Sequence, residues 1–269
     1  RDRYMVFPLA MGIKGASIAT SLSCIVGGLM VLGYFIFFSK TLKFYRLKMS
    51  VKSLRLSLRN VGYMAKIGLA TFIAELAIGV TMVTGNFMFL KYLGEAGVAA
   101  YSVGCYLLPL MFSISNAVAQ SSQPIISYNY GAGRMDRVRQ ALRMSIIAAS
   151  ICGVAITVGM WTWSPALAGI FLDSAEAAYA LARQGLPLLG LCALFFALNI
   201  TFIGYYQSCE RAARSICYML LRGVVFLVPG FFLLPILLGD AGLWLAIPVS
   251  EILTLTVIAM LYLWQHRRS

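Results

Sequence analysis

Long apolar segments alternate with short polar or charged connections along this chain. A helix needs about 20 mostly apolar residues to cross the hydrocarbon core of a bilayer. Seven segments meet this requirement, at residues 17–38, 67–90, 98–128, 144–172, 184–209, 215–239 and 241–264. The pattern therefore predicts an all-α, polytopic membrane protein built as a bundle of spanning helices.

Composition and charge agree with this picture and indicate an orientation. The chain of 269 residues is 61% hydrophobic, and its net charge of +13 comes from Lys and Arg that lie mostly between the apolar segments. In a soluble protein this charge would favour nucleic acid as a partner, but cytoplasmic loops of membrane proteins carry the same excess. We expect membrane lipid and no nucleic acid, with residues 39–62, residues 134–143 and the C-terminus in the cytoplasm.

The cysteines and the histidine give no sign of a metal or of a cofactor. Six cysteines lie in or beside apolar segments without a CxxC pair, and the one histidine, His266, stands near the end of the chain. We therefore expect no metal site, no organic cofactor and no disulfide framework. We find no phosphate-binding glycine loop or nucleophile motif in the sequence, so we do not expect an enzyme.

Two apolar segments open with the same spacing of small residues. A constant offset of 227 residues relates Gly12, Gly15 and Ala19 to Gly239, Gly242 and Ala246. Parallel repeats of several helices are a common transporter construction, and most of a first repeat would precede Arg1. The repeat predicts the end of a first lobe (1–38, with the helix 17–38), a basic cytoplasmic linker (39–62), a second six-helix lobe (63–265) and a cytoplasmic tail (266–269).

Polar residues recur at intervals of three and four in the segment 98–128, so they share one helix face. They are Ser102, Tyr106, Pro109, Ser113, Asn116, Gln120 and Gln123. An amide without a partner costs several kcal/mol in hydrocarbon, so this face should meet water or another helix. Interhelical hydrogen bonding is one interpretation. The length of the stripe favours the wall of a substrate cavity.

Two acidic residues lie inside apolar segments. Glu75 shares a helix face with Asn86, and Glu251 lies nearer the end of the last segment. A carboxylate at this depth is a candidate for function, because desolvation disfavours its charged form unless a proton or cation compensates it. The alternative is a static ion pair with a buried Lys or Arg. We expect Glu75 to couple to a cation, and Asn86 and Glu251 to line the substrate cavity.

Other polar residues inside the spans allow more than one interpretation. Asn199 and Tyr206 are seven residues apart in one segment, and either cavity lining or interhelical hydrogen bonding accounts for them. We count both among the candidate cavity residues. Arg222 is interpreted as a residue whose long side chain reaches the membrane surface.

The segment QPIISYNYGAGR at 123–134 resembles the signature that ends the eighth helix of multidrug and toxic compound extrusion (MATE) transporters. IGLATFIAELA at 67–77, AAYSVG at 99–104 and MGIKGASIAT at 11–20 resemble the openings of the seventh, eighth and sixth helices. The resemblance covers essentially the whole chain and favours the bacterial drug-efflux branch. It implies twelve helices in two lobes, of which this chain would hold the second lobe and the last helix of the first.

The resemblance also implies a function. The family exports organic cations in exchange for H⁺ or Na⁺, and its seventh-helix glutamate corresponds by motif to Glu75. Some members carry an aspartate in the tenth helix where this chain has Phe196, so a Na⁺ site of two carboxylates is not expected here. The leading hypothesis is a multi-pass antiporter of the inner (plasma) membrane that binds small-molecule drugs and acts together with the missing N-terminal lobe.

Two alternatives remain at this point. A flippase for lipid-linked oligosaccharides or a related exporter would share the fold, but its anionic cargo requires cationic residues in the cavity, for which Lys66 and Arg222 are the candidates. A seven-helix receptor fits the number of spans. The repeat at an offset of 227 residues disfavours it.

Overall fold

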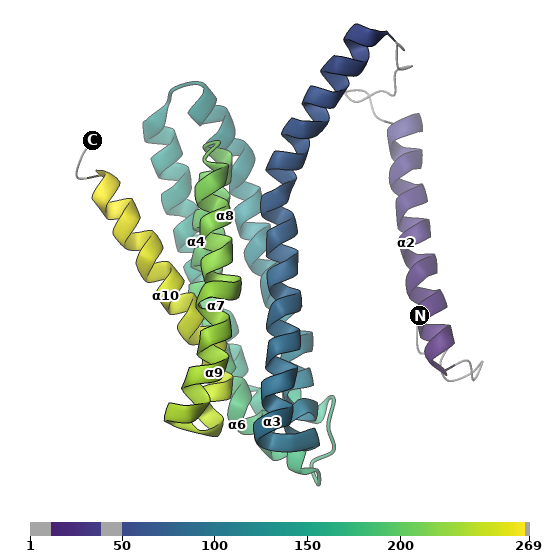
Figure 1. Ribbon diagram of the computed structural model, residues 1–269, viewed down its shortest axis with the longest axis vertical. Coiled ribbons are helices and arrows are strands. Elements are labelled where there is room, and N and C mark those ends of the chain that lie inside the picture. Colours follow the sequence, from purple (N-terminus) through teal and green to yellow (C-terminus); the bar gives the residue numbers. More distant parts are fainter. Residues whose placement is uncertain (1–11, 39–49, 267–269) are drawn as a thin grey trace. The chain divides into compact units, whose positions relative to one another are not determined.

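A computed structural model of the chain describes residues 12–38 and 50–266. The chain divides into two compact units, residues 1–60 and 61–269, and every regular element described in them is a helix (Figure 1). Helix α2 (Gly12–Phe37) of the first unit is mostly apolar, and most of its described side chains are exposed. The predicted boundaries within residues 1–11, 39–49 and 267–269 lie outside the described part of the chain.

Helix α3 (Val51–Gly131) contains two of the predicted spans, 67–90 and 98–128. They are separated at Gly94, whose φ of 64° and ψ of −157° interrupt the helix. Only glycine adopts this backbone conformation readily. The two predicted spans are therefore joined by a sharp break in one helix rather than by a loop at 91–97. The described part of the basic linker, residues 51–62, is the beginning of the same continuous helix.

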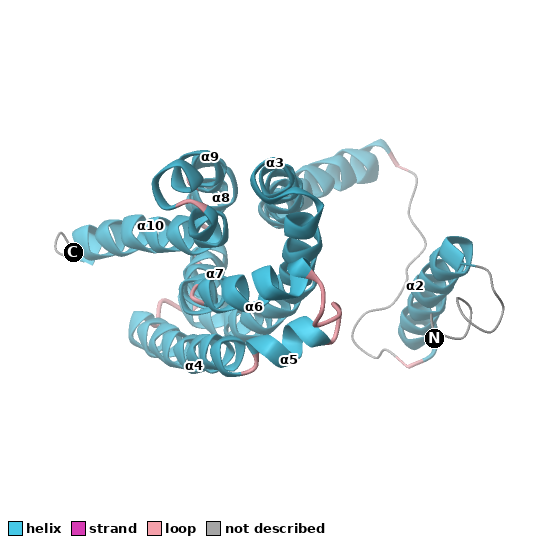
Figure 2. Ribbon diagram, turned by 90° about the horizontal axis from the view of Figure 1, so that it is seen from below, coloured by secondary structure: helices cyan, strands magenta, loops and turns pink. Residues whose placement is uncertain are grey.

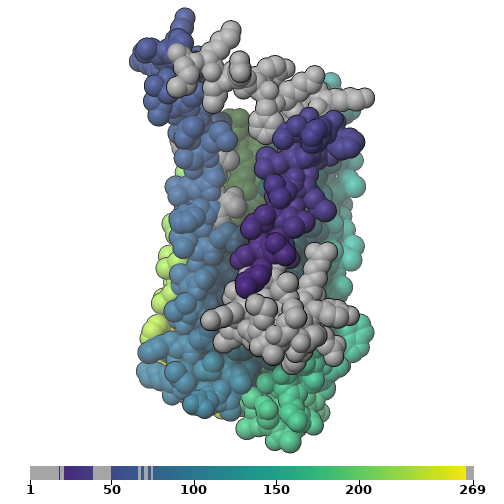
Figure 3. Space-filling view, turned by 90° about the vertical axis from the view of Figure 1, so that its right-hand side faces the viewer, coloured from purple at the N-terminus to yellow at the C-terminus, as the bar shows by residue number. Residues whose placement is uncertain are grey.

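The remaining helices belong to the second unit. They are α4 (Met135–Thr162), α5 (Ser164–Gly169), α6 (Ala177–Gly190), α7 (Cys192–Ser208), α8 (Ala212–Leu220), the π-helix η1 (Leu221–Val225), α9 (Leu227–Leu238) and α10 (Asp240–His266). Helix α7 contacts α4, α8 and α10 and lies among them in the view of Figure 2. The side chains of the first half of α3 form a column on the face shown in Figure 3.

Among the described residues, four helices are long and apolar enough to cross a membrane. The first, Glu75–Gly131, is the one that holds both spans on either side of Gly94. Helices α6 and α7 together form a further span with a bend of 40°. Two predicted spans need correction. The span 184–209 is divided between α6 and α7 at Leu191. The span 144–172 is not a single helix either. Helix α4 begins nine residues earlier and ends at Thr162, where the short α5 follows at Ser164.

The bend between α6 and α7 is stabilised from α4 and α5. Pro187 cannot donate a backbone hydrogen bond, and the bend frees further carbonyl groups that no water can reach in a bilayer. Three of these carbonyl oxygens accept side-chain hydrogen bonds: Ser164 Oγ to Arg183 O at 2.7 Å, Trp161 Nε1 to Pro187 O at 2.8 Å and Thr157 Oγ1 to Gly190 O at 2.9 Å. A broken helix is therefore compatible with a membrane interior at this point.

The second copy of the small-residue repeat forms the turn between α9 and α10. Gly239 ends α9 with a φ of 59°, which favours glycine over other residues. Gly242 lies so close to the backbone of Leu234 that a side chain would collide with it. Ala246 is buried one turn further on. The first copy, Gly12 to Ala19, lies in the first turns of α2, and the side chains of its three repeat residues lie outside the described set.

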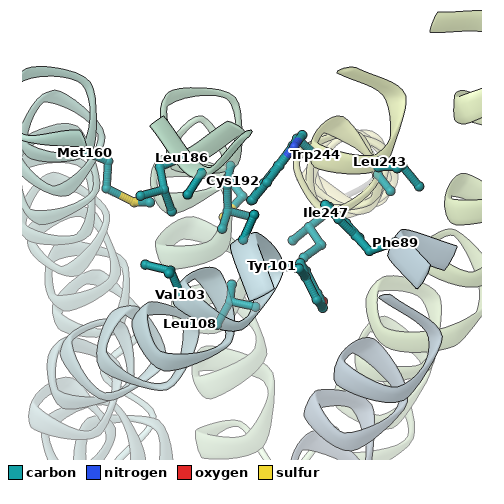
Figure 4. Packing of buried hydrophobic residues seen from close by; sticks show 14 of the residues in the cluster. Phe89, Tyr101, Val103, Leu108, Met160, Leu186, Cys192, Leu243, Trp244 and Ile247 are labelled. Carbon is teal, nitrogen blue, oxygen red and sulfur yellow. The ribbon is translucent and has the colours of Figure 1, made fainter. Parts of the chain in front are cut away.

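Aromatic side chains form the centre of the main core (Figure 4). The rings of Phe89 and Tyr101 stack at 4.4 Å between centroids, and Trp244 meets Phe89 edge to face at 4.8 Å. The Trp244 indole occupies the position where a side chain at 185 would lie, which explains why Gly185 is found there. This core joins the two halves of α3 to α6 and α10 and so fixes the walls of the site described next.

Candidate functional site

A polar cavity of about 450 Å³ lies between the two halves of α3, α7 and α8. We call it the Glu75 cavity. Its polar lining consists of Glu75, Asn116, Gln120, Gln123, Ser127 and Gln207, and its apolar lining includes Phe112, Ile200 and Met219. The sequence predicted four of these polar residues, and the structure brings all four to one cavity.

The amides reach the cavity because of local helix geometry. Asn116, Gln120 and Gln123 follow one another at four and three residues and therefore point to the same side of α3. Gln123 Nε2 donates to Gln207 Oε1 of α7 at 3.3 Å, so part of the stripe also holds two helices together. The two sequence interpretations, cavity wall and interhelical bonding, thus both apply. Sequence reasoning missed Gln207, which follows Ile200, Ile203 and Gly204 on the cavity-facing side of α7.

Glu75 stands on the first half of α3, opposite the amides. Its side chain is exposed, and it forms no ion pair among the residues whose side chains are described. The alternative of a static pair between Glu75 and a buried Lys or Arg thus finds no partner in this part of the chain. Among the described residues, the Glu75 carboxylate thus faces the amides of the cavity without a fixed counter-ion.

A second group of charged residues lies buried beside this cavity. Arg222 Nη2 and Glu251 Oε1 form an ion pair at 2.7 Å, and Arg222 Nε donates to the same oxygen at 3.1 Å. The side chains are 10% and 4% exposed. Asn199 Nδ2 donates to Glu251 Oε2 at 2.7 Å and to its backbone oxygen at 2.9 Å. Both carboxylate oxygens are therefore occupied.

The backbone around Arg222 is specialised. The π-helix η1 places Arg222 in a turn where the amide of Phe226 donates to the carbonyl oxygen of Leu221, five residues back. Single π-helical turns occur often at functional sites. Ser250 Oγ of α10 donates to the carbonyl oxygen of Arg222 at 2.7 Å. The guanidinium carbon lies 4.1 Å from the centre of the Phe196 ring, a cation–π contact from α7.

The ion pair and the Glu75 cavity are neighbours. Arg222 and Glu251 line a smaller space of about 40 Å³, and its walls include Phe112 and Met219. The same two side chains line the Glu75 cavity. The two spaces are thus separated by shared walls. Among the described residues, no group of three or more His, Cys, Asp or Glu side chains could hold a metal ion.

Comparisons with known proteins agree with this architecture. A family model named MatE matches residues 69–232, more than half of the chain. The chain belongs to the MatE family. The multidrug export protein MepA of Staphylococcus aureus (strain bovine RF122 / ET3-1) is 23% identical over 269 residues, which cover 99% of this chain and 57% of that protein. The chain thus spans little more than half the length of this MatE relative.

Solved structures show the same fold. An outward-facing multidrug resistance MATE family transporter of the MOP superfamily matches with a TM-score of 0.82 and 19% identity, over 99% of this chain and 58% of that one. A MOP superfamily transporter from Pyrococcus furiosus, whose reversed pocket polarity suggested a different function, matches with a TM-score of 0.80 and 19% identity, over the same shares. The predicted all-α membrane bundle of MATE type is confirmed.

Not every predicted cavity residue of this MatE protein lies at the Glu75 cavity. Asn199 is fully buried and bonds to Glu251 instead. Tyr206 is buried in an aromatic cluster against Tyr218, at 5.4 Å between ring centroids. Helix periodicity places both residues correctly on α7, but packing of α7 against α8 and α10 turns them away from the cavity.

Three further predicted residues are not among those that line the Glu75 cavity. Ser113 is exposed and donates to the carbonyl oxygen of Pro109 at 2.8 Å, so its hydroxyl is satisfied within α3. Asn86 is half-buried and lines neither of the two spaces. Glu251 lines the smaller space, but as the partner of Arg222. The interpretation of Arg222 as a residue that reaches the membrane surface is wrong, because its side chain is buried in this pair.

Proposed function

We propose that the intact protein is a secondary active antiporter of the plasma membrane, which exports amphipathic, often cationic compounds in exchange for H⁺ or Na⁺. Membership of a family of multidrug efflux transporters supports the general activity. The coupling ion, the cargo and the movement of two lobes around a central site are our proposal. The second lobe would be this unit, and residues outside the chain would supply most of the first.

One observation carries the proposal. Glu75 faces a cavity of about 450 Å³ whose other polar groups are neutral, and no fixed cation neutralises it among the described residues. A carboxylate inside a membrane-spanning segment that has no fixed counter-ion attracts a proton, a small cation or an organic cation. Carboxylate and amide oxygens are also the ligands that hard cations prefer.

Competition for this carboxylate would couple the two movements. A proton or Na⁺ that binds Glu75 removes the charge that holds a cationic drug, so the drug leaves when the ion enters. Rocking of two lobes around a central site would expose the carboxylate first to one side of the membrane and then to the other. The gradient of the ion would thereby drive export of the drug.

The test is the variant Glu75→Gln in the intact protein. We expect it to abolish ion-driven uptake of ethidium into inverted membrane vesicles, because the amide cannot exchange a proton or hold a cation. The thermal unfolding temperature of the purified variant should stay near that of the wild type. Glu95→Gln is a matched control, because Glu95 is exposed next to the break at Gly94 and lines neither space.

Two results would contradict the coupling role. Uptake at the wild-type rate by Glu75→Gln would exclude the coupling role directly. Loss of transport together with a stability loss of roughly 3 to 5 kcal/mol would instead indicate that Glu75 belongs to a structural ion pair, because its removal would leave a buried cation unpaired.

The alternative of an exporter for anionic lipid-linked cargo finds less support. Such cargo needs an uncompensated cation in the cavity, whereas Arg222 is paired with Glu251 at 2.7 Å. The side chain of Lys66 lies outside the described residues. The third hypothesis, a seven-helix receptor, does not fit a chain that belongs to the MatE family.

A further inference from the structure

We propose that the Arg222–Glu251 ion pair determines the charge sign of the Glu75 cavity, which makes Glu251 a specificity-determining residue for cationic cargo. The inference rests on the proposed function, because it assumes that cargo binds in the Glu75 cavity. It assigns a role to a pair of residues that lies outside the cavity itself.

The charges of the two adjoining spaces support this role. Three charged side chains line them, Glu75 in the larger and Arg222 with Glu251 in the smaller. Glu251 neutralises Arg222 at 2.7 Å, so one negative charge, that of Glu75, remains uncompensated. Without the carboxylate of Glu251, the positive charge of Arg222 would balance Glu75 across the side chains of Phe112 and Met219, which line both spaces.

The structure holds Arg222 in place independently of its ion pair. Ser250 fixes the backbone carbonyl of Arg222 at 2.7 Å, and the Phe196 ring lies 4.1 Å from the guanidinium carbon. An arginine stays charged in proteins. Neutralising Glu251 would therefore leave a positive charge at the wall rather than remove it. The Asn199 amide, which donates to Glu251, is uncharged and cannot replace the lost carboxylate.

The proposal predicts an order of affinities that depends on charge alone. Glu251→Gln should weaken binding of a cation, Arg222→Gln should strengthen it, and the double variant with both changes should return it close to the wild-type value. Two unit charges roughly 10 Å apart at an effective dielectric constant of about 20 change a binding constant by more than tenfold. We therefore expect about a tenfold change in each direction for the single variants.

The experiment uses two probes of nearly equal shape and opposite charge, tetraphenylphosphonium and tetraphenylborate. Their affinities for the purified intact protein are measured by calorimetry in the wild type, the two single variants and the double variant. Glu251→Gln should lose affinity for the phosphonium and gain affinity for the borate. A thermal unfolding curve of each variant accompanies the titration, because a buried charge without its partner lowers stability.

The outcomes separate the proposal from its alternatives. If the pair has only a structural role, both single variants lose affinity for both probes, and the double variant shows no reciprocal pattern. If Glu251→Gln does not fold, the phosphonium affinity of Arg222→Gln is compared with that of the double variant. Equal affinities overturn the proposal, and stronger binding by Arg222→Gln supports it. Phosphonium binding by the wild type that does not depend on Glu75 contradicts the proposed function instead.

Discussion

At the residue scale, the polar side chains of α3 show how one helix face acquires its role. Asn116 and Gln120 line the Glu75 cavity, whereas Ser115, one position away from Asn116, is buried with its hydroxyl bonded to the Met111 carbonyl oxygen at 2.8 Å. A rotation of about 100° per residue separates these environments. Polar residues of α3 therefore line the cavity or are buried according to their position on the helix.

Thiol labelling can measure this difference. In a background without native cysteines, we expect Asn116→Cys and Gln120→Cys to react with a water-soluble maleimide, because both positions line the cavity. Ser115→Cys is the matched control on the same helix and should stay unmodified, because Ser115 is buried. Equal protection of all three positions would mean that the stripe serves only as interhelical contact.

At the element scale, side chains of neighbouring helices donate hydrogen bonds to the carbonyl oxygens that a helix bend leaves free. The bend between α6 and α7 has its carbonyl oxygens bonded by Thr157, Trp161 and Ser164. The close approach of α4 and α7 depends on one residue, Gly153. A side chain carbon at Gly153 would lie 2.6 Å from the Leu194 Cα, so only glycine allows the two backbones to come this near.

Gly153→Ala should therefore destabilise the protein by roughly 1 to 3 kcal/mol, because the methyl group forces the backbones apart. Gly159→Ala is the control on the same helix, where the nearest contact, the Trp163 ring, would be an ordinary 3.7 Å away. Its effect should be near zero or stabilising by up to about 1 kcal/mol, because alanine favours helix. Thermal unfolding of the purified variants provides the measurement. Similar unfolding temperatures for both would refute the close contact.

At the scale of the whole molecule, we expect charge to set the orientation in the membrane. The arginines 134, 137, 139 and 143 gather around the connection from α3 to α4, whereas the connection from α5 to α6 carries Asp173 and Glu176. Cytoplasmic loops of membrane proteins carry the excess of Lys and Arg. The first connection, the basic residues 51–62 and the C-terminus should therefore all lie in the cytoplasm.

Labelling from outside intact cells tests this topology. We expect Ala175→Cys, in an exposed position between α5 and α6, to react with a membrane-impermeant maleimide. Lys52→Cys and Arg137→Cys are equally exposed in the fold and should react only after the membrane is permeabilised. Labelling of either basic segment from outside would indicate the opposite orientation.

The sequence by itself determined the features that depend on local geometry and on the solvent. Bilayer thickness and hydropathy predicted most of the spanning segments, although not the break of 144–172 at Trp163 or the bend between α6 and α7 within 184–209. The helical period placed Asn116, Gln120 and Gln123 on one face, and the cost of an isolated carboxylate in hydrocarbon singled out Glu75. These inferences succeed because each follows from a few neighbouring residues and the medium around them.

Only the tertiary structure decided which faces meet. Arg222 and Glu251 are 29 residues apart in sequence, and Asn199 is 52 residues from Glu251, on three different elements. A period of 3.6 residues fixes the direction of a side chain relative to its own helix, but its partner depends on how helices pack. Sequence periodicity placed Asn199 and Tyr206 on one helix face but left their partners open. Packing joined Asn199 and Arg222 to Glu251 and buried Tyr206 in an aromatic cluster.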